Sequence, residues 1–369
     1  MIRVLLVAGS IPPAPCGVGD YTFKLAQSLA ATGKVETAIL TGNSVSAAEQ
    51  AHDVLVFSLV ASWKVGQIGR VARLLGEWEP DIVHVQYPTQ GYGRGMLPSI
   101  IPLLARIRGA KTVQTWHEGF SRRDAFKLLM QISARSRQIV VRSNFIELVH
   151  PSLRWPISRL GKPSLIANAS AIPRADCSDE ELESIKRSLL LGQRRLIVFF
   201  GFLYPPKGAE LLFEIADPQT DHIVIAGPAA DASVYLDELK LLAGSPPWEG
   251  RVTFTGFVSP ERASLILAAA DAVVLPFRQG SGPWNTSIHS ATLNGAFVIT
   301  TSSKLSGYDR TTNVYYARPD DVHEMRAALA QYCGRRIDIP ERGDGDRDNW
   351  ETIAGKHFQI YANLVGEHA

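Results

Sequence analysis

Short apolar runs alternate with segments of helical period along nearly the whole chain, and this alternation restricts the fold more than any other feature. Six runs in the first half are short and rich in β-branched residues: RVLLVAG, ETAILTG, HDVLVFSL, DIVHVQYP, KTVQTWHE and QIVVRSN. Most of them precede a helical segment such as KVGQIGRVARLLGEW or GMLPSIIPLLARIRG. This order is typical of a parallel sheet that is covered by helices.

The same pattern starts again after the stretch LIANASAIPRADCSDEE, and the 369 residues favour two domains over one. Further strands are expected at RRLIVFFGF, HIVIAGP, RVTFTGF, DAVVLPF and FVITTSS, and helices are expected to begin near Lys207, Val234, Ser259 and Asn285. We predict an α/β fold with two doubly wound, Rossmann-like domains, residues 1–172 and 173–345, which face a cleft. Residues 346–369 contain a long amphipathic helix, which we expect to pack back across the domain junction.

Several classes of protein are excluded by composition. The three cysteines, Cys16, Cys177 and Cys333, fit neither a disulfide framework nor a zinc site. No apolar run approaches the roughly 20 residues of a membrane-spanning helix, and we interpret the first residues as a strand rather than a secretory signal. A reader of nucleic acid is disfavoured because aromatic residues are not interleaved with the basic ones. We expect a cytoplasmic protein.

Charge is distributed unevenly along the chain. Residues 1–170 carry 19 Lys and Arg against 10 Asp and Glu, whereas the remaining residues carry 19 against 26. Arg122, Arg123 and Lys127 flank the apolar helical segment AFKLLMQI. Such a basic amphipathic surface binds anionic lipid headgroups, so one prediction is a peripheral contact with the inner face of a membrane. The alternative is a solvated face around a core helix.

Two loops combine glycine with a predicted helix start, which favours phosphate because backbone N–H groups approach it closely there. The first, GSIPPAPCGVGDYTF, has Gly17 and Gly19 before a helix whose expected cap is Asp20. It lacks the third glycine of a dinucleotide fingerprint, since Thr22 stands there. The second, GFLYPPKGAEL, places Lys207 at the expected helix start, where an anion would offset the unfavourable charge. A tight turn and an exposed lysine are the structural alternatives.

The third loop, GSGPWNTSIHS, offers many hydrogen-bond donors and little bulk. Its small and polar residues are Gly280, Ser281, Gly282, Asn285, Thr286 and Ser287. Trp284 lies among them, where it would stack on a sugar or cover the core. The loop predicts a polar ligand that is multiply hydroxylated or phosphorylated.

The order of these motifs resembles that of the retaining GT-B glycosyltransferases of group 1, the family 4-like enzymes. The resemblance spans nearly the whole chain and is carried by the Gly17–Gly19 loop, His117 after KTVQTW, LIANASAIP, GFLYPPKG, RVTFTGFVSPER, DAVVLPF and the last helix. It implies that the first domain binds the acceptor and the second a nucleotide sugar, and the basic first domain favours a glycan or lipid-linked acceptor. It implies transfer without a metal ion or cofactor, and a role in polysaccharide biosynthesis.

The resemblance also implies roles for individual residues. His117 would lie near the reacting carbon or the sugar hydroxyls, and Lys207 would act on the donor diphosphate; these two are the predicted catalytic residues. Gly17, Gly19, Lys207, Thr286 and Ser287 would bind the diphosphate, Phe257 and Ser290 the nucleotide, and Ser281, Gly282 and Asn285 the donor sugar.

This chain departs from the family in its third loop. The family carries two glutamates eight positions apart, and their places are taken by Gly282 and Ser290. Phe202 also replaces the arginine that is common in the second loop. A catalytically lapsed protein that binds a nucleotide or supports a partner enzyme therefore stays an alternative. A nucleotide-sugar epimerase is the other, although its family uses several carboxylates in the cleft.

Two acidic or histidine motifs do not fit a metal site. Asp344 and Asp346 form a D-x-D match, but the adjacent residues lack the glycine and glutamate of a calcium loop. His117 and Glu118 begin like a zinc protease motif, but no second histidine follows at the required spacing. We therefore predict no metal ligands.

Overall fold

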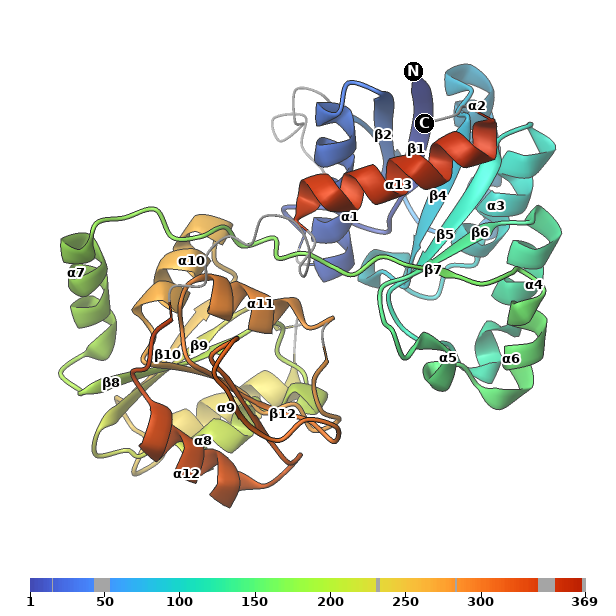
Figure 1. Ribbon diagram of the computed structural model, residues 1–369. Helices are drawn as coiled ribbons and strands as arrows, with labels where there is room; N and C mark the ends of the chain where they lie inside the picture. The colour runs from blue at the N-terminus through green and yellow to red at the C-terminus, as the bar shows by residue number, and fades with distance from the viewer. Residues whose placement is uncertain (15, 43–53, 230–232, 283, 338–348, 367–369) are drawn as a thin grey trace. The chain divides into compact units, whose positions relative to one another are not determined.

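The computed structural model describes residues 1–14, 16–42, 54–229, 233–282, 284–337 and 349–366. The chain divides into two compact units, the first formed by Met1–Ala169 together with Asp348–Ala369 and the second by Ser170–Arg347. Each unit has a seven-stranded sheet with helices against it (Figure 1). The prediction of two Rossmann-like domains is confirmed.

Unit 1 contains a sheet in which all neighbouring strands are parallel, in the order β3-β2-β1-β4-β5-β6-β7. Its strands are β1 (Ile2–Val7), β2 (Val35–Gly42), β3 (Val54–Val60), β4 (Ile82–Tyr87), β5 (Lys111–Trp116), β6 (Arg137–Val140) and β7 (Ser164–Leu165). The direction of winding reverses between β1 and β4. In open α/β sheets, ligands bind beyond the carboxyl ends of the strands at such a switch point.

Helices cover both faces of this sheet (Figure 1). They are α1 (Gly17–Ala31), α2 (Ile68–Trp78), α3 (Leu97–Ile107), α4 (Ala125–Ala134), α5 (Phe145–Leu148), α6 (Pro151–Ser158) and α13 (Trp350–Val365), with short 3₁₀ turns η2 (Val65–Gln67), η3 (Gln90–Tyr92) and η4 (Arg122–Asp124). Successive residues of a strand point to opposite faces. In β1, Val4 and Leu6 thus pack with α1 and α13, whereas Leu5 and Val7 pack with α2 and α3.

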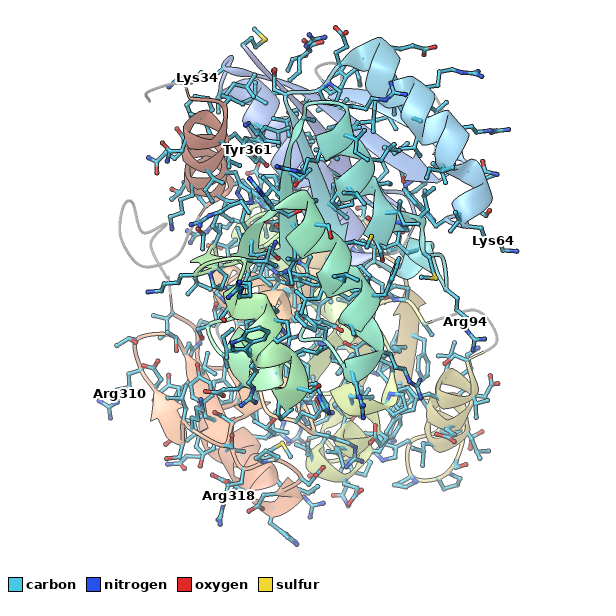
Figure 2. The ribbon with its side chains drawn as sticks, turned by 90° about the vertical axis from the view of Figure 1, so that its right-hand side faces the viewer. Lys34, Lys64, Arg94, Arg310, Arg318 and Tyr361 are labelled. Carbon is cyan, nitrogen blue, oxygen red and sulfur yellow. The ribbon has the colours of Figure 1, made fainter. Side chains whose placement is uncertain are left out.

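The last helix, α13, belongs to unit 1, although the chain of unit 2 separates it from the rest of that unit. Its N-terminus is capped by Asn349, whose side-chain oxygen accepts a hydrogen bond of 2.8 Å from the N–H of Thr352. It packs on α1 with Ile353 and Tyr361 fully buried. Figure 2 shows Tyr361 on the side of this helix that faces the sheet.

Unit 2 repeats the arrangement with the order β10-β9-β8-β11-β12-β14-β13, in which only the β13–β14 pair is antiparallel. The strands are β8 (Arg195–Phe200), β9 (Asp221–Ala226), β10 (Val252–Gly256), β11 (Ala272–Leu275), β12 (Val298–Thr301), β13 (Gly307–Asp309) and β14 (Val314–Ala317). The helices are α7 (Asp179–Leu190), α8 (Leu212–Ile215), α9 (Val234–Ala243), α10 (Pro260–Ala269), α11 (Thr286–Leu293) and α12 (Val322–Tyr332). The switch point lies between β8 and β11.

The helix expected from Lys207 onward is not continuous, so this prediction is wrong. Two 3₁₀ turns, η5 (Pro205–Lys207) and η6 (Ala209–Leu211), precede the four-residue helix α8. Gly208 separates the two turns because its φ is +69°, a left-handed conformation that ends a right-handed helix.

Candidate functional site

The predicted ligand loops of unit 2 meet at its switch point. Ser287, in the first turn of α11, lies so near the end of β8 that a side chain at Gly201 would approach its hydroxyl to 3.4 Å. Gly201 and Gly227 follow the adjacent strands β8 and β9, and a Cβ on Gly227 would fall 2.0 Å from the carbonyl oxygen of Gly201. Gly227 therefore allows a close backbone approach between the two strand ends that a residue with a Cβ would block.

Lys207 lies at the end of η5 with its Nζ 4.3 Å from the centroid of the Phe277 ring and 5.6 Å from that of Tyr204. Gly208 holds this turn against the loop that follows β11, since a Cβ there would meet the carbonyl oxygen of Pro276 at 2.4 Å. The N–H of Arg278 also donates to the carbonyl oxygen of Pro206 at 3.1 Å. The ammonium group is thus positioned by both loops, although no regular helix begins beside it.

The loop before α11 holds the predicted sugar-binding residues. The Asn285 side-chain oxygen accepts a 2.9 Å hydrogen bond from the N–H of Gly282. A Cβ on Gly282 would fall 2.2 Å from the ring of Trp284, so the indole fills the space of a side chain at this position. Ser281 Oγ is buried without a hydrogen-bond partner among the described residues. Buried hydroxyls usually have a hydrogen-bond partner. Because Ser281 Oγ has none among the described residues, it is available to a ligand.

The two residues predicted to bind the nucleotide differ in exposure. Phe257 follows β10, and 55% of its surface is exposed. Ser290 is buried, and its hydroxyl lies 2.8 Å from the carbonyl oxygen of Thr286 and 2.7 Å from Ser170 Oγ. A ribose hydroxyl would therefore have to donate to a remaining lone pair of Ser290 Oγ, because the single proton of Ser290 is already donated to one of these partners.

A bracket of charged side chains, which sequence reasoning missed, lies beside the Lys207 loop. Arg278 donates hydrogen bonds to Glu210 and, at 2.5 Å, to Asp320, and Tyr235 donates to Glu210. Burial, with the adjacent Glu210 carboxylate, raises the pKa of Tyr235. Because these residues come from separate segments of the chain, no local sequence motif indicates that they lie together.

In unit 1, the glycines of the first loop lie inside α1. Cys16 caps this helix and its Sγ accepts from the N–H of Gly19 at 3.4 Å, so the prediction of Asp20 as the cap is wrong. A Cβ on Gly19 would fall 2.4 Å from the carbonyl oxygen of Ser10, which accounts for this glycine by packing. Gly17 is exposed in the first turn. Of the two, Gly17 is the better placed for a ligand.

Asp20 lies in the first turn of α1 and is half-buried. Burial raises its pKa to about 6, although Lys24 opposes the shift.

His117 follows β5 and is 7% exposed. Its Nε2 lies 2.9 Å from Gln86 Oε1, and the ring of Tyr21 packs edge-on to it at 4.8 Å. Burial, with positive charge from Arg142, lowers the pKa of His117 to about 3. The imidazole is therefore neutral and suited to hydrogen bonding rather than to acting as a cation.

His84 and Gln86, both buried in β4, were not among the predicted site residues. They lie two positions apart in the apolar run IVHVQY and so point to one face of the sheet. Polar residues at alternate positions of a buried strand are the signal that could have drawn attention to them.

The basic amphipathic segment suggested that Lys127 is a free surface cation, but its side chain is mostly covered and paired. Its side chain is 11% exposed, and its Nζ lies 3.3 Å from Asp124 Oδ1 and 2.9 Å from the centroid of the Tyr87 ring. Burial lowers its pKa to about 8, although Asp124 opposes the shift. Arg122 and Arg123 are exposed at the start of the same helical segment.

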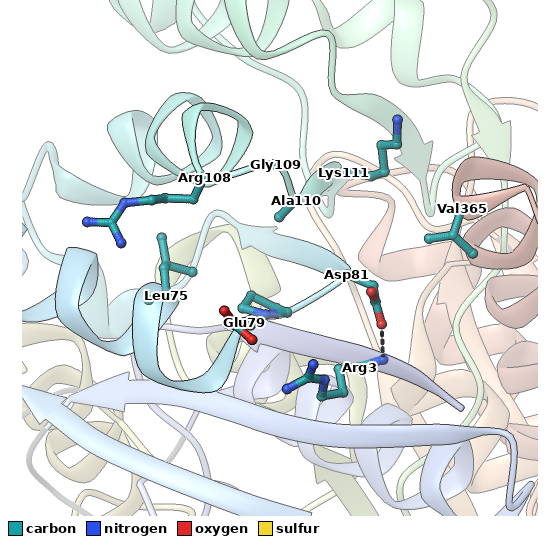
Figure 3. A pocket seen from close by; sticks show the side chains of 11 residues that line it. Arg3, Leu75, Glu79, Asp81, Arg108, Gly109, Ala110, Lys111 and Val365 are labelled. Atoms are coloured by element: carbon teal, nitrogen blue, oxygen red, sulfur yellow. Dashed lines mark hydrogen bonds between the residues drawn. The ribbon is translucent and has the colours of Figure 1, made fainter.

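The two sheets also have hollows at their opposite, amino ends. One of about 560 Å³ is lined in unit 1 by Arg3, Asp81, Arg108 and Lys111 among others (Figure 3). The other, of about 540 Å³, includes Arg195 and Arg326 in unit 2. Neither contains a predicted site residue, and both lie at the end of a sheet where ligands of this fold class are not bound.

The described part of the chain contains no cluster of three or more His, Cys, Asp or Glu side chains arranged to hold a metal ion. Asp344 and Asp346 lie outside the described residues. None of the described helices has the length and apolar character needed to cross a bilayer.

Comparisons with known proteins identify the family. A model described as "Glycosyl transferase 4-like domain" matches residues 16–152, and one described as "Glycosyl transferases group 1" matches residues 194–334. A comparison with curated protein sequences finds no match.

Solved structures share the fold at low sequence identity. HepE of Anabaena, in complex with UDP and glucose, has a TM-score of 0.67 and 17% identity over 99% of this chain and 96% of its own. Sucrose-phosphate synthase of Thermosynechococcus elongatus has a TM-score of 0.72 and 16% identity over 99% and 100%. The catalytic domain of starch synthase IV of Arabidopsis thaliana, bound to ADP and acarbose, has a TM-score of 0.66 and 13% identity over all of both chains.

The two family models match one unit each and together cover most of the chain. The related structures extend the likeness over nearly its full length. The chain therefore belongs to the group 1 glycosyltransferases of the GT-B fold.

Proposed function

We propose that this glycosyltransferase moves a sugar from a nucleoside-diphosphate sugar to a glycan or lipid-linked acceptor, with retained configuration and without a metal ion. The observation that best supports a donor site is Lys207, which two loops hold at the switch point of unit 2. HepE structures that contain UDP or UDP-glucose, and the starch synthase structure that contains ADP, support a nucleotide donor.

The chemistry follows from the charge that develops in the reaction. The bond between the anomeric carbon and the phosphate oxygen breaks, and negative charge grows on the diphosphate. Lys207 and the N–H groups at the start of α11, near Thr286 and Ser287, would stabilise that charge. The acceptor oxygen attacks from the same face, and the leaving phosphate takes its proton. His117 is neutral and would orient a sugar hydroxyl.

A second candidate is a lapsed enzyme that binds a nucleotide or supports a partner. Two observations favour it: Trp284 fills the space beside Gly282, and Ser290 Oγ is already hydrogen-bonded within unit 2. An epimerase is less favoured because the third loop lacks carboxylates, although a putative UDP-N-acetylglucosamine 2-epimerase shares the fold with a TM-score of 0.55.

The first experiment is a thermal-shift titration with UDP, GDP, ADP and their sugar conjugates. A ligand at about 100 times its Kd adds about 2.7 kcal/mol to the free energy of unfolding. A selective upward shift would identify the nucleotide, whereas no shift with any of them would favour the lapsed enzyme. Transfer is then assayed with EDTA present, and NMR of the product reports its anomeric configuration. An inverted product or loss of activity in EDTA would contradict the corresponding proposal.

The acceptor side of the proposal includes a membrane contact through α4–α6. Five large apolar side chains are exposed there: Phe126, Leu129, Ile146, Leu148 and Trp155, the last at 71%. Residues 122–162 carry nine Lys and Arg against two acidic residues. Exposed apolar side chains bordered by positive charge fit the surface of an anionic bilayer.

Sedimentation with liposomes tests this contact directly. We expect the protein to bind vesicles that contain phosphatidylglycerol and not vesicles of phosphatidylcholine alone. The pair Phe126→Ser and Trp155→Ser should abolish binding, whereas Leu241→Ser, at an exposed apolar residue of unit 2, should not. Equal recovery of the wild type with both kinds of vesicle would contradict the proposal.

A further inference from the structure

A chain of buried polar side chains connects α13 to His117 within unit 1. His84 Nδ1 lies 2.6 Å from Tyr361 Oη, and His84 Nε2 lies 2.7 Å from Thr115 Oγ1. Gln86 Nε2 is 3.2 Å from His84 Nε2, and Gln86 Oε1 is 2.9 Å from His117 Nε2. Tyr361, His84, Gln86 and Thr115 are fully buried.

The Gln86 amide lies between the His84 and His117 rings and determines which nitrogen of each ring carries the proton. An amide oxygen only accepts and an amide nitrogen only donates. His117 Nε2 must therefore carry a proton, which it donates to Gln86 Oε1. His84 Nε2 must lack one, because it accepts from Gln86 Nε2 and, with it, from the hydroxyl of Thr115. The remaining proton of His84 is then on Nδ1 and is donated to the oxygen of Tyr361.

Both rings carry only one proton, so each has one donor and one acceptor nitrogen. Burial holds the pKa of His84 well below its ordinary value and that of His117 at about 3. Arg142 donates from its Nε to the His117 carbonyl oxygen at 3.1 Å, and its positive charge further disfavours protonation of the ring. The lone pair of His117 is consequently on Nδ1.

We propose that Gln86 is a positioning residue that fixes His117 as the Nε2–H tautomer, so that Nδ1 accepts a hydrogen bond from a hydroxyl of the donor sugar. His84 and Tyr361 hold the Gln86 amide in the orientation that this requires. The inference rests on the proposed role of His117 at the donor sugar.

The chain offers a matched control for the loss of a buried glutamine. Gln114 is buried in the adjacent strand β5, and its Oε1 accepts from Gln131 Nε2 at 2.9 Å. Gln114→Leu removes hydrogen bonds of the same kind as Gln86→Leu, without a contact to His117. Any difference between the two variants in the state of His117 then reflects the position of Gln86.

The test combines ¹⁵N NMR of histidine-labelled full-length protein with steady-state kinetics. The His117 signals are assigned by their loss in His117→Asn. We expect a protonated Nε2 in the wild type and in Gln114→Leu, and a mixture of tautomers in Gln86→Leu. We expect kcat/KM for the nucleotide sugar to fall about 10- to 100-fold in Gln86→Leu, and to stay within about twofold in Gln114→Leu.

Tyr361→Phe gives a second, milder test if Gln86→Leu does not fold. It removes the acceptor for His84 Nδ1–H and keeps the ring, so we expect a partial loss of the single His117 tautomer. A proton on His117 Nδ1 in the wild type would overturn the inference. An unchanged His117 tautomer in both Gln86→Leu and Tyr361→Phe would overturn it as well. Absence of transfer by the wild type would instead refute the proposed function, because the tautomer is measured without turnover.

Discussion

Lys207 Nζ lies 4.3 Å from the centroid of the Phe277 ring, which connects the loop after β8 to the loop after β11. A cation above an aromatic face is attracted to it by about 0.5 to 2 kcal/mol. Phe277 is buried, so the ring is a fixed support for the ammonium group. The position of the charge is therefore determined by unit 2 before any ligand arrives.

Lys207→Met should remove this charge while keeping most of the packing. We expect kcat for sugar transfer to fall about 10²- to 10³-fold, as when one stabilising donor is lost from a transition state. Nucleotide binding, followed by thermal shift, should weaken as well. Lys240→Met, at an exposed position of α9, serves as the control and should leave both unchanged. Wild-type turnover by Lys207→Met would contradict the assignment.

Gly208→Ala should destabilise the protein for two separable reasons. The left-handed φ of +69° costs an alanine about 1 kcal/mol, and the Cβ would fall 2.4 Å from the Pro276 carbonyl oxygen. Gly250→Ala has a similar φ of +73° and no atom within 4 Å of the added Cβ. In denaturant unfolding we expect a loss of about 2 to 4 kcal/mol for the first and about 1 kcal/mol for the second. Equal losses of unfolding free energy in the two variants would show that the close approach of the Cβ to the Pro276 carbonyl oxygen does not affect stability.

Most of the fold could be predicted from the sequence because its strands are long, apolar and separated by helices of clear period. All eleven strands predicted from apolar runs are present within a few residues of their expected positions. The strands β7 and β13 were missed because they have two and three residues, too few for a period, and the four-residue strand β14 was not predicted either. The helix expected at Lys207 failed because the left-handed conformation of Gly208 overrode the apolar pattern.

Only those parts of the site that consist of residues close together in the sequence could be predicted. Loops rich in glycine could be placed at strand ends, and the family resemblance supplied roles for their residues. The partners of His117 could not be found in this way, since Gln86 and His84 lie on another strand and Tyr361 on the last helix. The filling of the Gly282 space by Trp284 likewise depends on the path of the loop, which no period describes.

Acid should destabilise unit 1 through its three buried histidines. Burial lowers the pKa of His117 to about 3 and of His357 to about 4, and holds that of His84 well below its ordinary value. In the unfolded chain these groups titrate near pH 6.5. The unfolded state thus binds more protons below that pH, and stability must fall as the pH falls from about 6.5 towards 4.

Thermal melts between pH 7.5 and pH 4.5 measure this slope. His357→Gln should have a shallower slope than the wild type because one titrating group is removed. His323→Gln, at an exposed position of α12, should keep the wild-type slope. If all three proteins have the same slope, the buried histidines are not its source.

Asp20→Asn should stabilise the protein at neutral pH. The pKa of Asp20 is raised from 3.8 to about 6 in the folded state, so the folded state binds more protons between these values and stability falls as the pH rises through them. Two pKa units correspond to at most about 3 kcal/mol. We expect the gain in free energy of unfolding to be full above about pH 6 and to disappear near pH 4. Asp237→Asn, an exposed first-turn residue of α9, should show no such gain.

The return of α13 to unit 1 gives the chain a nested order of folding. Residues 170–347 form a complete unit of their own, whereas the first sheet lacks the helix that packs on α1 until residue 365 has been made. On the ribosome, Tyr21 and His84 of unit 1 therefore stay uncovered by α13 until residues 170–347, which form unit 2, have been synthesised. A fragment that stops at residue 169 keeps every strand of that sheet and still has an open side to its core.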